Sequence, residues 1–382
     1  MPWIAFLANG MWLMVIGLMG PSIPSIIVEL DLSYSSAGLI FTLLSAGSLL
    51  GSLIAGVVSD FSKRKLLWMS LTTVLIAGLI LVGFTPGYIA LLCTVFFMSL
   101  FGGPIGAVGQ SIMLQMFPEK RGKYISLSTM FAAGGSFLAP LIIALVLFLG
   151  GNWRSAFFTV AGFVLILFTW MLFIKLPETT AHHGSKTPFK TIVSDKSLLV
   201  VGLLIFLSVG VDIGFSYWLA EYFTTTVGFA AVYSSIAVSV YLCGVMIGRF
   251  SLSRYAHSAR SGLVILTGLA FSTVLLVIIL NVPYPWLKLA LCPFYGIGIG
   301  PLFPYLLAKG TGLYPGKSGA VTGILFAMMS LSGMVFPFLI GLIGTNTGIE
   351  GAYYTLLGIE VLIFIGIYFA NKRLRKPDAV KS

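Results

Sequence analysis

Three acidic side chains, Asp212, Glu221 and Glu360, lie inside long apolar stretches, whereas the other eight fall at or beyond the ends of such stretches. Charge inside a bilayer is costly and therefore seldom idle. A helix starting near residue 198 and rising about 1.5 Å per residue places Asp212 roughly 21 Å along it, near mid-membrane. There a carboxyl group can take up a proton and release it when water enters. We predict this proton-coupling role for Asp212, and we expect its anion to lack a cationic partner. Glu221 is expected near the external surface, where it is easily solvated.

The segment around Asp212 also carries aromatic and hydroxyl groups. Trp218 and Tyr222 are four residues apart and share one helix face, and Asp212 and Ser216 share a neighbouring stripe. Aromatic faces cover the apolar side of a sugar ring, while carboxylate, amide and hydroxyl groups bind its hydroxyls. Anchoring at the outer membrane boundary is the alternative for Trp218 and Tyr222. The candidate substrate-binding residues are Asn9, Trp12, Gln110, Ser216, Tyr217, Trp218, Tyr222, Tyr241 and Tyr295.

Other kinds of chemistry find little support in the sequence. His182, His183 and His257 have no neighbouring ligands at metal-binding spacing, and the three cysteines lie in apolar stretches without paired loop spacing. No phosphate-binding glycine loop is present, which excludes ATP-driven pumping by this chain on its own. We therefore expect no metal, no cofactor and no enzymatic activity.

The elements that must position these residues are long apolar helices. Hydrophobic residues make up 58% of the 382 residues, charged residues make up 9%, and the mean hydropathy is +1.05. A soluble domain carries about 25% charged residues, so a soluble globular protein is excluded. Polar punctuation predicts twelve spans, at 3–28, 36–58, 66–84, 89–114, 124–149, 155–175, 198–223, 232–252, 262–280, 286–307, 319–342 and 352–370.

Basic residues outnumber acidic ones by 22 to 11, which gives a formal net charge of +11. An even number of spans puts both termini on one side. If that side is cytoplasmic, 20 of the 22 basic residues fall in cytoplasmic segments, and only Arg154 and Lys288 fall outside. This asymmetry follows the positive-inside rule. Membrane topology and contact with an anionic inner leaflet therefore explain the charge, and nucleic-acid binding is excluded.

A constant offset of 197 residues relates glycine and proline positions in the two halves of the chain. The pairs are Gly47 and Gly244, Gly51 and Gly248, Gly103 and Gly300, Pro104 and Pro301, Pro118 and Pro315, Gly122 and Gly319, Pro140 and Pro337, and Gly151 and Gly348. Because 197 residues carry six spans, the two six-helix halves are parallel repeats and enclose a central cavity. The predicted domains are residues 1–175 and 198–371, joined by a cytoplasmic linker at 176–197 and followed by a basic cytoplasmic tail at 372–382. Transport by alternating access follows as the predicted function.

Glycine-rich runs occur at 102–106 and at 296–301, in corresponding spans of the two halves. They permit close helix packing, or they bend helices that line a pathway. Both interpretations stay open.

The stretch Gly51–Lys65, GSLIAGVVSDFSKRK, resembles the signature loop of the major facilitator superfamily, with departures at Phe61 and Lys63. Residues 118–122, 151–154 and 177–179 carry further matches, so the resemblance covers the whole chain. It implies an all-α membrane fold of twelve helices. In that family the loop holds the two halves together on the cytoplasmic side, which implies a gating role for Asp60, Arg64 and Gly56; orientation by positive charge alone is the alternative. The resemblance also makes the span of Glu360 a peripheral one, where a structural contact is expected.

Residues 210–222 and 244–249 resemble the fucose-permease-like branch of the superfamily, the fucose/glucose/proton symporters. The resemblance implies proton-coupled uptake of a sugar or related polar metabolite. The first half lacks the acidic groups usual in that branch, so proton-driven efflux of drugs or metabolites is the alternative, and a non-transporting membrane sensor is a third possibility. We expect a monomer in the inner or plasma membrane, with a small-molecule substrate, protons and lipid as its partners.

Overall fold

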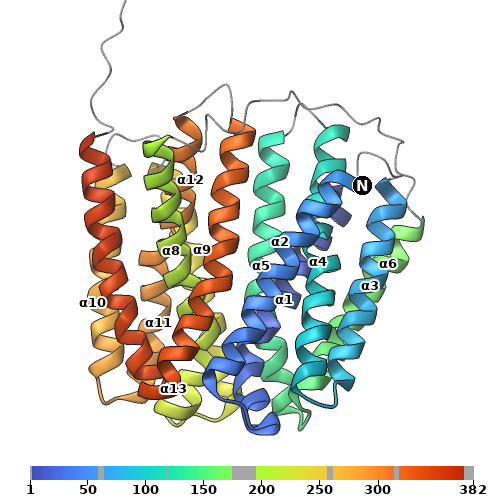
Figure 1. Cartoon of the computed structure of the whole chain (residues 1–382), viewed down its shortest axis with the longest axis horizontal. Helices are drawn as coiled ribbons and strands as arrows, with labels where there is room; N and C mark the ends of the chain where they lie inside the picture. The colour runs from blue at the N-terminus through green and yellow to red at the C-terminus, as the bar shows by residue number, and fades with distance from the viewer. Residues whose placement is uncertain are drawn as a thin grey trace, which may run out of the picture.

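The computed structural model describes residues 2–58, 64–117, 119, 121–173, 195–255, 261–313 and 318–373. The elements in this part of the chain are helical and stand side by side across the molecule (Figure 1). They are α1 (Pro2–Leu30), α2 (Tyr34–Val58), α3 (Arg64–Phe84), α4 (Tyr88–Met116), α5 (Arg121–Phe148), α6 (Trp153–Phe173), α8 (Lys196–Glu221), the π-helix η2 (Tyr222–Thr226), α9 (Ala231–Tyr255), α10 (Ser261–Asn281), α11 (Pro285–Ile299), α12 (Leu302–Gly312) and α13 (Ser318–Arg373).

Within the described residues, eleven helical stretches are long and apolar enough to cross a membrane. The last of them, Val321–Ala370, holds two crossings, because α13 reverses at Gly348, where φ is 73°. Glycine adopts this left-handed conformation without a Cβ clash. The predicted spans 319–342 and 352–370 flank this point. Helices α11 and α12 together form the predicted span 286–307, interrupted at Pro301, which lacks the N–H that a continuous helix needs. The twelve predicted spans and the all-α membrane fold are therefore confirmed.

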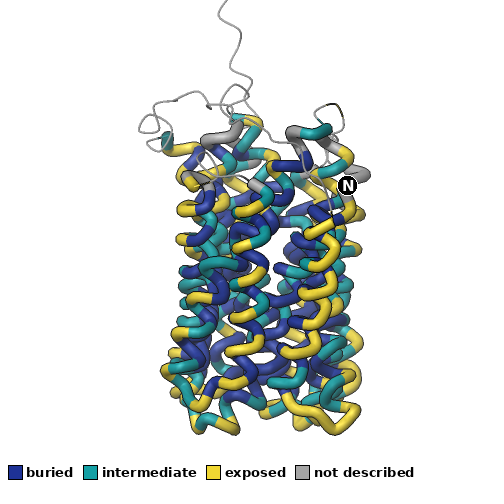
Figure 2. Tube along the Cα trace, turned by 90° about the vertical axis from the view of Figure 1, so that its right-hand side faces the viewer, coloured by how far each residue is buried: buried dark blue, intermediate teal, exposed yellow. Residues whose placement is uncertain are grey.

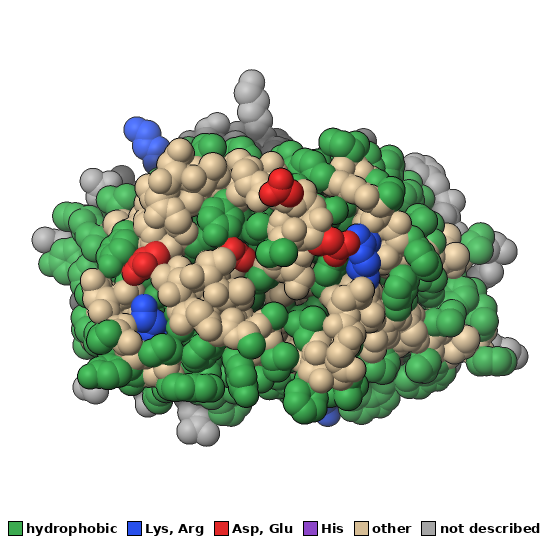
Figure 3. All heavy atoms as spheres, turned by 90° about the horizontal axis from the view of Figure 1, so that it is seen from below, with side chains coloured by type: hydrophobic (Ala, Val, Ile, Leu, Met, Phe, Trp, Pro, Cys, Tyr) green, Lys and Arg blue, Asp and Glu red, His purple; other side chains and the backbone are tan. Residues whose placement is uncertain are grey.

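Both described chain ends lie at one end of the bundle, which we call the termini end, and the opposite end is the distal end (Figure 1). Between them, large apolar side chains cover the perimeter: Phe97 of α4 is 56% exposed and Ile166 of α6 is 67% exposed. Buried residues fill the interior along the whole length of the bundle (Figure 2). Acidic side chains are visible on the distal face, some beside Lys or Arg side chains and the others among neutral groups (Figure 3). A perimeter of this kind suits a lipid environment.

Helix contacts reproduce the repeat seen in the sequence. A methyl group at Gly47 would meet the Phe96 carbonyl, and one at Gly51 would meet the Leu100 carbonyl, so α2 and α4 pack backbone to backbone. The residues 197 positions later do the same between α9 and α11: Gly244 faces the Pro293 carbonyl, and Gly248 faces the Ile297 carbonyl. These four glycines are therefore packing points where only a hydrogen fits. In the glycine-rich runs, Gly103 and Gly300 likewise face the Ser48 and Val245 carbonyls, which favours close helix packing there.

The two halves meet near the distal end. Thr42 of α2 donates a hydrogen bond to the Met334 carbonyl of α13 at 2.8 Å, and Ser239 of α9 donates to the Phe137 carbonyl of α5 at 3.0 Å. The rings of Phe41 and Tyr217 stack with their centroids 4.5 Å apart. These contacts close the distal end around the central space between the halves.

Candidate functional site

A cavity of about 340 Å³ lies between the halves, on the termini side of the distal contacts. The first half contributes apolar groups such as Leu13 and Ile16, together with the hydroxyls of Ser45, Ser48 and Ser136. The second half contributes Asp212, Ser216 and Tyr217 from α8 and Arg249 from α9. Charge therefore enters the cavity from the second half, while the first half supplies hydroxyls and apolar surface.

Asp212 is the centre of the polar part of this cavity. The Tyr241 hydroxyl donates a hydrogen bond to Asp212 Oδ1 at 2.6 Å, and Arg249 Nη2 lies 3.5 Å from Oδ2. The side chains of Asp212 and Arg249 are 19% and 37% exposed, so both are accessible from the cavity. A carboxylate with one neutral donor, one cation and open space in front of it can exchange a proton or contact a solute.

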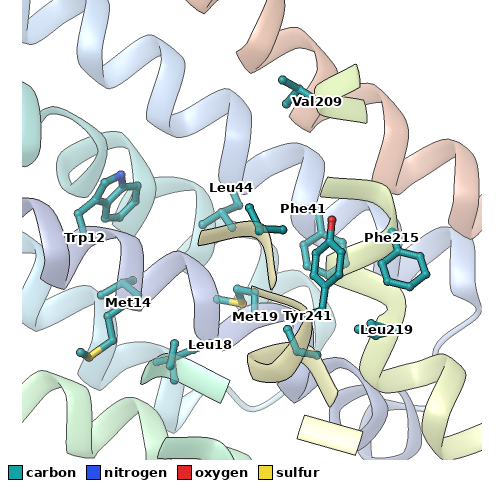
Figure 4. Close-up of a cluster of buried hydrophobic side chains, with 14 of the residues drawn as sticks. Trp12, Met14, Leu18, Met19, Phe41, Leu44, Val209, Phe215, Leu219 and Tyr241 are labelled. Atoms are coloured by element: carbon teal, nitrogen blue, oxygen red, sulfur yellow. The ribbon is translucent and has the colours of Figure 1, made fainter. Parts of the chain in front are cut away.

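The helices fix this arrangement through aromatic packing. Tyr241 is fully buried on α9, with its ring 5.0 Å from that of Phe215 on α8 and 5.9 Å from that of Tyr295 on α11. Phe215 and Tyr241 lie close together in the buried cluster (Figure 4). The Tyr241 hydroxyl is consequently held against Asp212 from behind the cavity wall.

Arg249 gives Asp212 a cationic partner that the sequence does not predict. The positive-inside distribution counts Arg249 among the cytoplasmic basic residues, and the predicted Asp212 anion has no such partner. That expectation is wrong, because Arg249 reaches back into the bundle, where its Nε also donates to the Gly300 carbonyl at 3.3 Å. The available signal was its position inside the predicted span 232–252, from which a long side chain can extend toward the core as readily as toward the membrane surface.

The predicted candidates divide between the cavity and the packed interior. Ser216 and Tyr217 line the cavity. Five aromatic candidates are buried outside its lining: Trp12, Trp218, Tyr222, Tyr241 and Tyr295. Of these, Tyr241 contacts the lining residue Asp212. Trp218 donates to the Pro337 carbonyl at 2.9 Å, and its ring meets that of Tyr34 of the first half, so it packs at the contact between the halves.

Tyr222 and Tyr295 also have partners within the protein. Tyr222 accepts a hydrogen bond from Lys288 at 2.8 Å, and its own hydroxyl donates to the Ile279 carbonyl at 3.2 Å. Tyr295 donates to Glu360 Oε1 at 2.7 Å. The hydroxyls of both residues are thus engaged away from the cavity.

The amide candidates of the first half do not line the cavity either. Asn9 of α1 donates to the Ser128 hydroxyl of α5 at 3.0 Å, which ties two helices of that half together. Gln110 is half-buried on α4, outside the cavity lining. The described lining therefore presents carboxylate, guanidinium and hydroxyl groups to a solute, and it contains no side-chain amide.

The two remaining acids inside the bundle differ from each other. Glu360 is fully buried and accepts from Tyr295 and, at 2.6 Å, from Thr273, which is the structural contact that was expected. Glu221 was expected to be solvated, but it is only 2% exposed, because the closed distal ends cover it. Its Oε2 atom has no hydrogen-bond partner in the described part of the chain.

The gating residues cannot be placed in the same way. Asp60 lies outside the described residues, and of Gly56 and Arg64 only the backbone positions, in α2 and at the start of α3, are described. Across the described ranges, no group of three or more His, Cys, Asp or Glu side chains gathers as a metal site would require.

Comparison with known proteins identifies the family. The Major Facilitator Superfamily matches residues 5–324, so the chain belongs to this superfamily of transporters. It is 25% identical, over 87% of its own length and 84% of the other's, to the uncharacterized MFS-type transporter YfnC of Bacillus subtilis (strain 168).

Solved structures share the fold. A bacterial homolog of the human lysosomal transporter Spinster, in an inward-facing and unoccupied conformation, matches with a TM-score of 0.82 at 15% identity, covering 99% of this chain and 98% of the other. A D-xylose-proton symporter matches with a TM-score of 0.77 at 15% identity, covering 96% of each chain. The protein is therefore a multi-pass membrane transporter of the major facilitator fold.

Proposed function

We propose that the protein is a secondary active transporter that couples the movement of a small solute to protons through Asp212. The observation that carries the proposal is the placement of Asp212 in the cavity between the halves, between Tyr241 and Arg249. When water reaches the carboxylate it can ionise beside Arg249. Protonation of Asp212 ends its pairing with Arg249 and leaves the guanidinium free to contact the solute.

A sugar or related polar metabolite is the first candidate substrate. Tyr217 offers an aromatic face to the cavity, Ser216 and Ser136 offer hydroxyls, and a D-xylose-proton symporter shares the fold. Accumulation of radiolabelled sugars in proteoliposomes under an imposed pH gradient tests this candidate. A panel of sugars that neither accumulates nor shifts the melting temperature of the purified protein would exclude it.

A small amphipathic anion is the second candidate, and Arg249 is the observation that favours it. The distance of 3.5 Å to Asp212 and the 37% exposure leave the guanidinium accessible to a carboxylate from the cavity. The apolar groups of α1 face it across the same space. Melting temperatures measured with organic acids, with sugars and with cationic drugs distinguish the candidates. Stabilisation by an organic acid supports the anion, stabilisation by a sugar supports the first candidate, and stabilisation by a cationic drug supports drug efflux.

The arrangement in the membrane is part of the proposal. The protein is a monomer in the inner or plasma membrane, and both termini and the linker 176–197 face the cytoplasm. The membrane leaflet on that side contains anionic lipid. The cavity, on the termini side of the distal contacts, then belongs to the inward-facing side of the cycle. Asp60, with Arg64 and Gly56, closes that side in the opposite state, and Asp60→Asn should slow turnover while substrate binding changes little.

A further inference from the structure

Glu221 is a buried acid that the proposed coupling site does not use. It ends α8, is 2% exposed, and is followed directly by the π-helix η2. Single π-turns of this kind recur at functional sites. Its Oε2 atom is the one buried side-chain oxygen or nitrogen without a hydrogen-bond partner within the described part of the chain. A carboxylate in this condition is costly, whereas a neutral carboxyl group is tolerated much better.

The surroundings of Glu221 belong to both halves. Tyr34, the first residue of α2, interacts through its hydroxyl with Glu221 and Thr225. One turn before Glu221, the Trp218 ring meets the Tyr34 ring edge-on, with centroids 5.7 Å apart. The acid is thus covered by a residue of the opposite half. Separation of the distal ends, as alternating access requires, removes that cover and exposes Glu221 to water.

Charged and titratable neighbours do not neutralise Glu221. The titratable groups that interact with it are the Tyr34 hydroxyl from α2 and Tyr353 from α13. In η2, Thr225 donates to the backbone carbonyl of Glu221, and Thr224 donates to the Ser234 hydroxyl of α9. The buried cation of this end, Lys288 of α11, donates to the Tyr222 hydroxyl and the Leu280 carbonyl.

The acidic and basic groups of α1 and α6 are engaged with one another. Glu29 accepts hydrogen bonds from Arg154 at 2.6 Å and from Trp153 at 2.6 Å. Within the described ranges, Glu221 therefore has no ion-pair partner.

We propose that Glu221 binds a proton when the distal ends close over it and releases that proton when they part. The proton forms an O–H bond on the carboxylate and returns to water on the same distal side, because the closed contact also separates Glu221 from the cavity lining. No proton crosses the membrane through this site. The pH on the distal side thereby sets how readily the transporter opens to that side, independently of the coupling proposed for Asp212.

Spin labels on Leu149 and Asn346 report this equilibrium. Both residues are exposed at the distal end, one in each half. The distance between the two spin labels is measured on the protein in nanodiscs without substrate. The protein carries Asp212→Asn, so that the proposed coupling residue cannot titrate. One coupled proton changes the ratio of closed to open molecules by up to about tenfold per pH unit.

Acidification from about pH 8 to about pH 6 should raise the closed-to-open ratio about tenfold or more. In Glu221→Gln, which is neutral at every pH, the distal end should stay closed, with less than about a twofold change over the same range. Glu360→Gln is the matched control, since it removes a buried acid of the same half away from the distal contacts, and it should keep the full response.

A response that persists in Glu221→Gln, or that disappears in Glu360→Gln as well, would overturn the assignment. If Glu221→Gln does not fold, the pH dependence of the label distance in the Asp212→Asn protein still tests the proposal. A distance that does not change with pH contradicts the proposal by itself. Since the readout contains no flux, its failure is distinguishable from failure of the proposed transport function.

Discussion

The Tyr241 hydroxyl donates a 2.6 Å hydrogen bond to Asp212 Oδ1, while Arg249 approaches the other carboxylate oxygen at 3.5 Å. The two contacts come from one helix, α9, and meet a carboxylate on its neighbour, α8. A rigid aromatic donor and a long flexible cation therefore hold the same group, and only the cation can leave without disturbing the packed core. The carboxylate can respond to solute or water in the cavity while its position stays fixed.

Replacement of Asp212 by Asn tests proton coupling directly. Asparagine keeps the size of the side chain and its hydrogen-bonding capacity, but it cannot bind a proton in this range of pH. We expect Asp212→Asn to abolish accumulation driven by a pH gradient, while exchange of solute across proteoliposomes survives. If the variant still concentrates solute under an imposed pH difference, Asp212 serves binding or structure alone.

Much of the fold could be predicted, because the length of each apolar stretch and the spacing of the glycines can be read directly along the chain. The 197-residue offset between Gly51 and Gly248 could be read from the sequence, and each glycine does face the equivalent carbonyl, of Leu100 or Ile297. The depth of Asp212 followed from helix rise in the same way.

The side-chain environments could not be predicted in this way. Arg249 can extend in either direction along its helix, and the choice depends on Asp212 in another helix. Glu221 is buried because the opposite half closes over it, which involves Tyr34 at a distance of 187 positions along the chain. Both outcomes depend on tertiary contacts that spacing within one helix does not encode.

The Arg249–Asp212 pair should show energetic coupling. Arg249→Gln leaves a partly buried carboxylate without its cation, so we expect a lower melting temperature near neutral pH. Adding Asp212→Asn removes the uncompensated charge and should restore part of the loss. Because the pair is partly exposed and 3.5 Å apart, the coupling free energy should be on the order of 1 kcal/mol. Strictly additive effects in the double-mutant cycle would mean that the two groups do not interact.

Labelling from outside intact cells tests the proposed orientation. Cysteine at Ser185, in the linker, and at Asn346, at the distal end before Gly348, should differ in reactivity toward a membrane-impermeant maleimide. We expect only the Asn346 position to react, because the positive-inside distribution places the linker in the cytoplasm. Reaction at Ser185 in sealed cells would reverse the topology.

Closure of the distal end depends on the absence of a side chain at Gly38. A Cβ there would lie 3.0 Å from both the Phe338 Cα and the Pro337 carbonyl oxygen, which are backbone atoms of the opposite half and cannot rotate away. Alanine favours the helix itself by up to about 1 kcal/mol, but overpacking at a tight contact costs about 1–3 kcal/mol. The helix propensity acts equally in the open and closed states, whereas the clash acts only in the closed one.

Gly38→Ala should therefore shift the population toward molecules open at the distal end, by roughly fivefold to a hundredfold for that cost. The distance between labels on Leu149 and Asn346 measures the shift. Gly162→Ala in α6 is the matched control, since a Cβ at Gly162 meets nothing within 4 Å, and it should leave the distance distribution unchanged. An unchanged distribution in Gly38→Ala would show that the helices slide apart locally without opening the halves, and the distal contact would then not be the element that controls access.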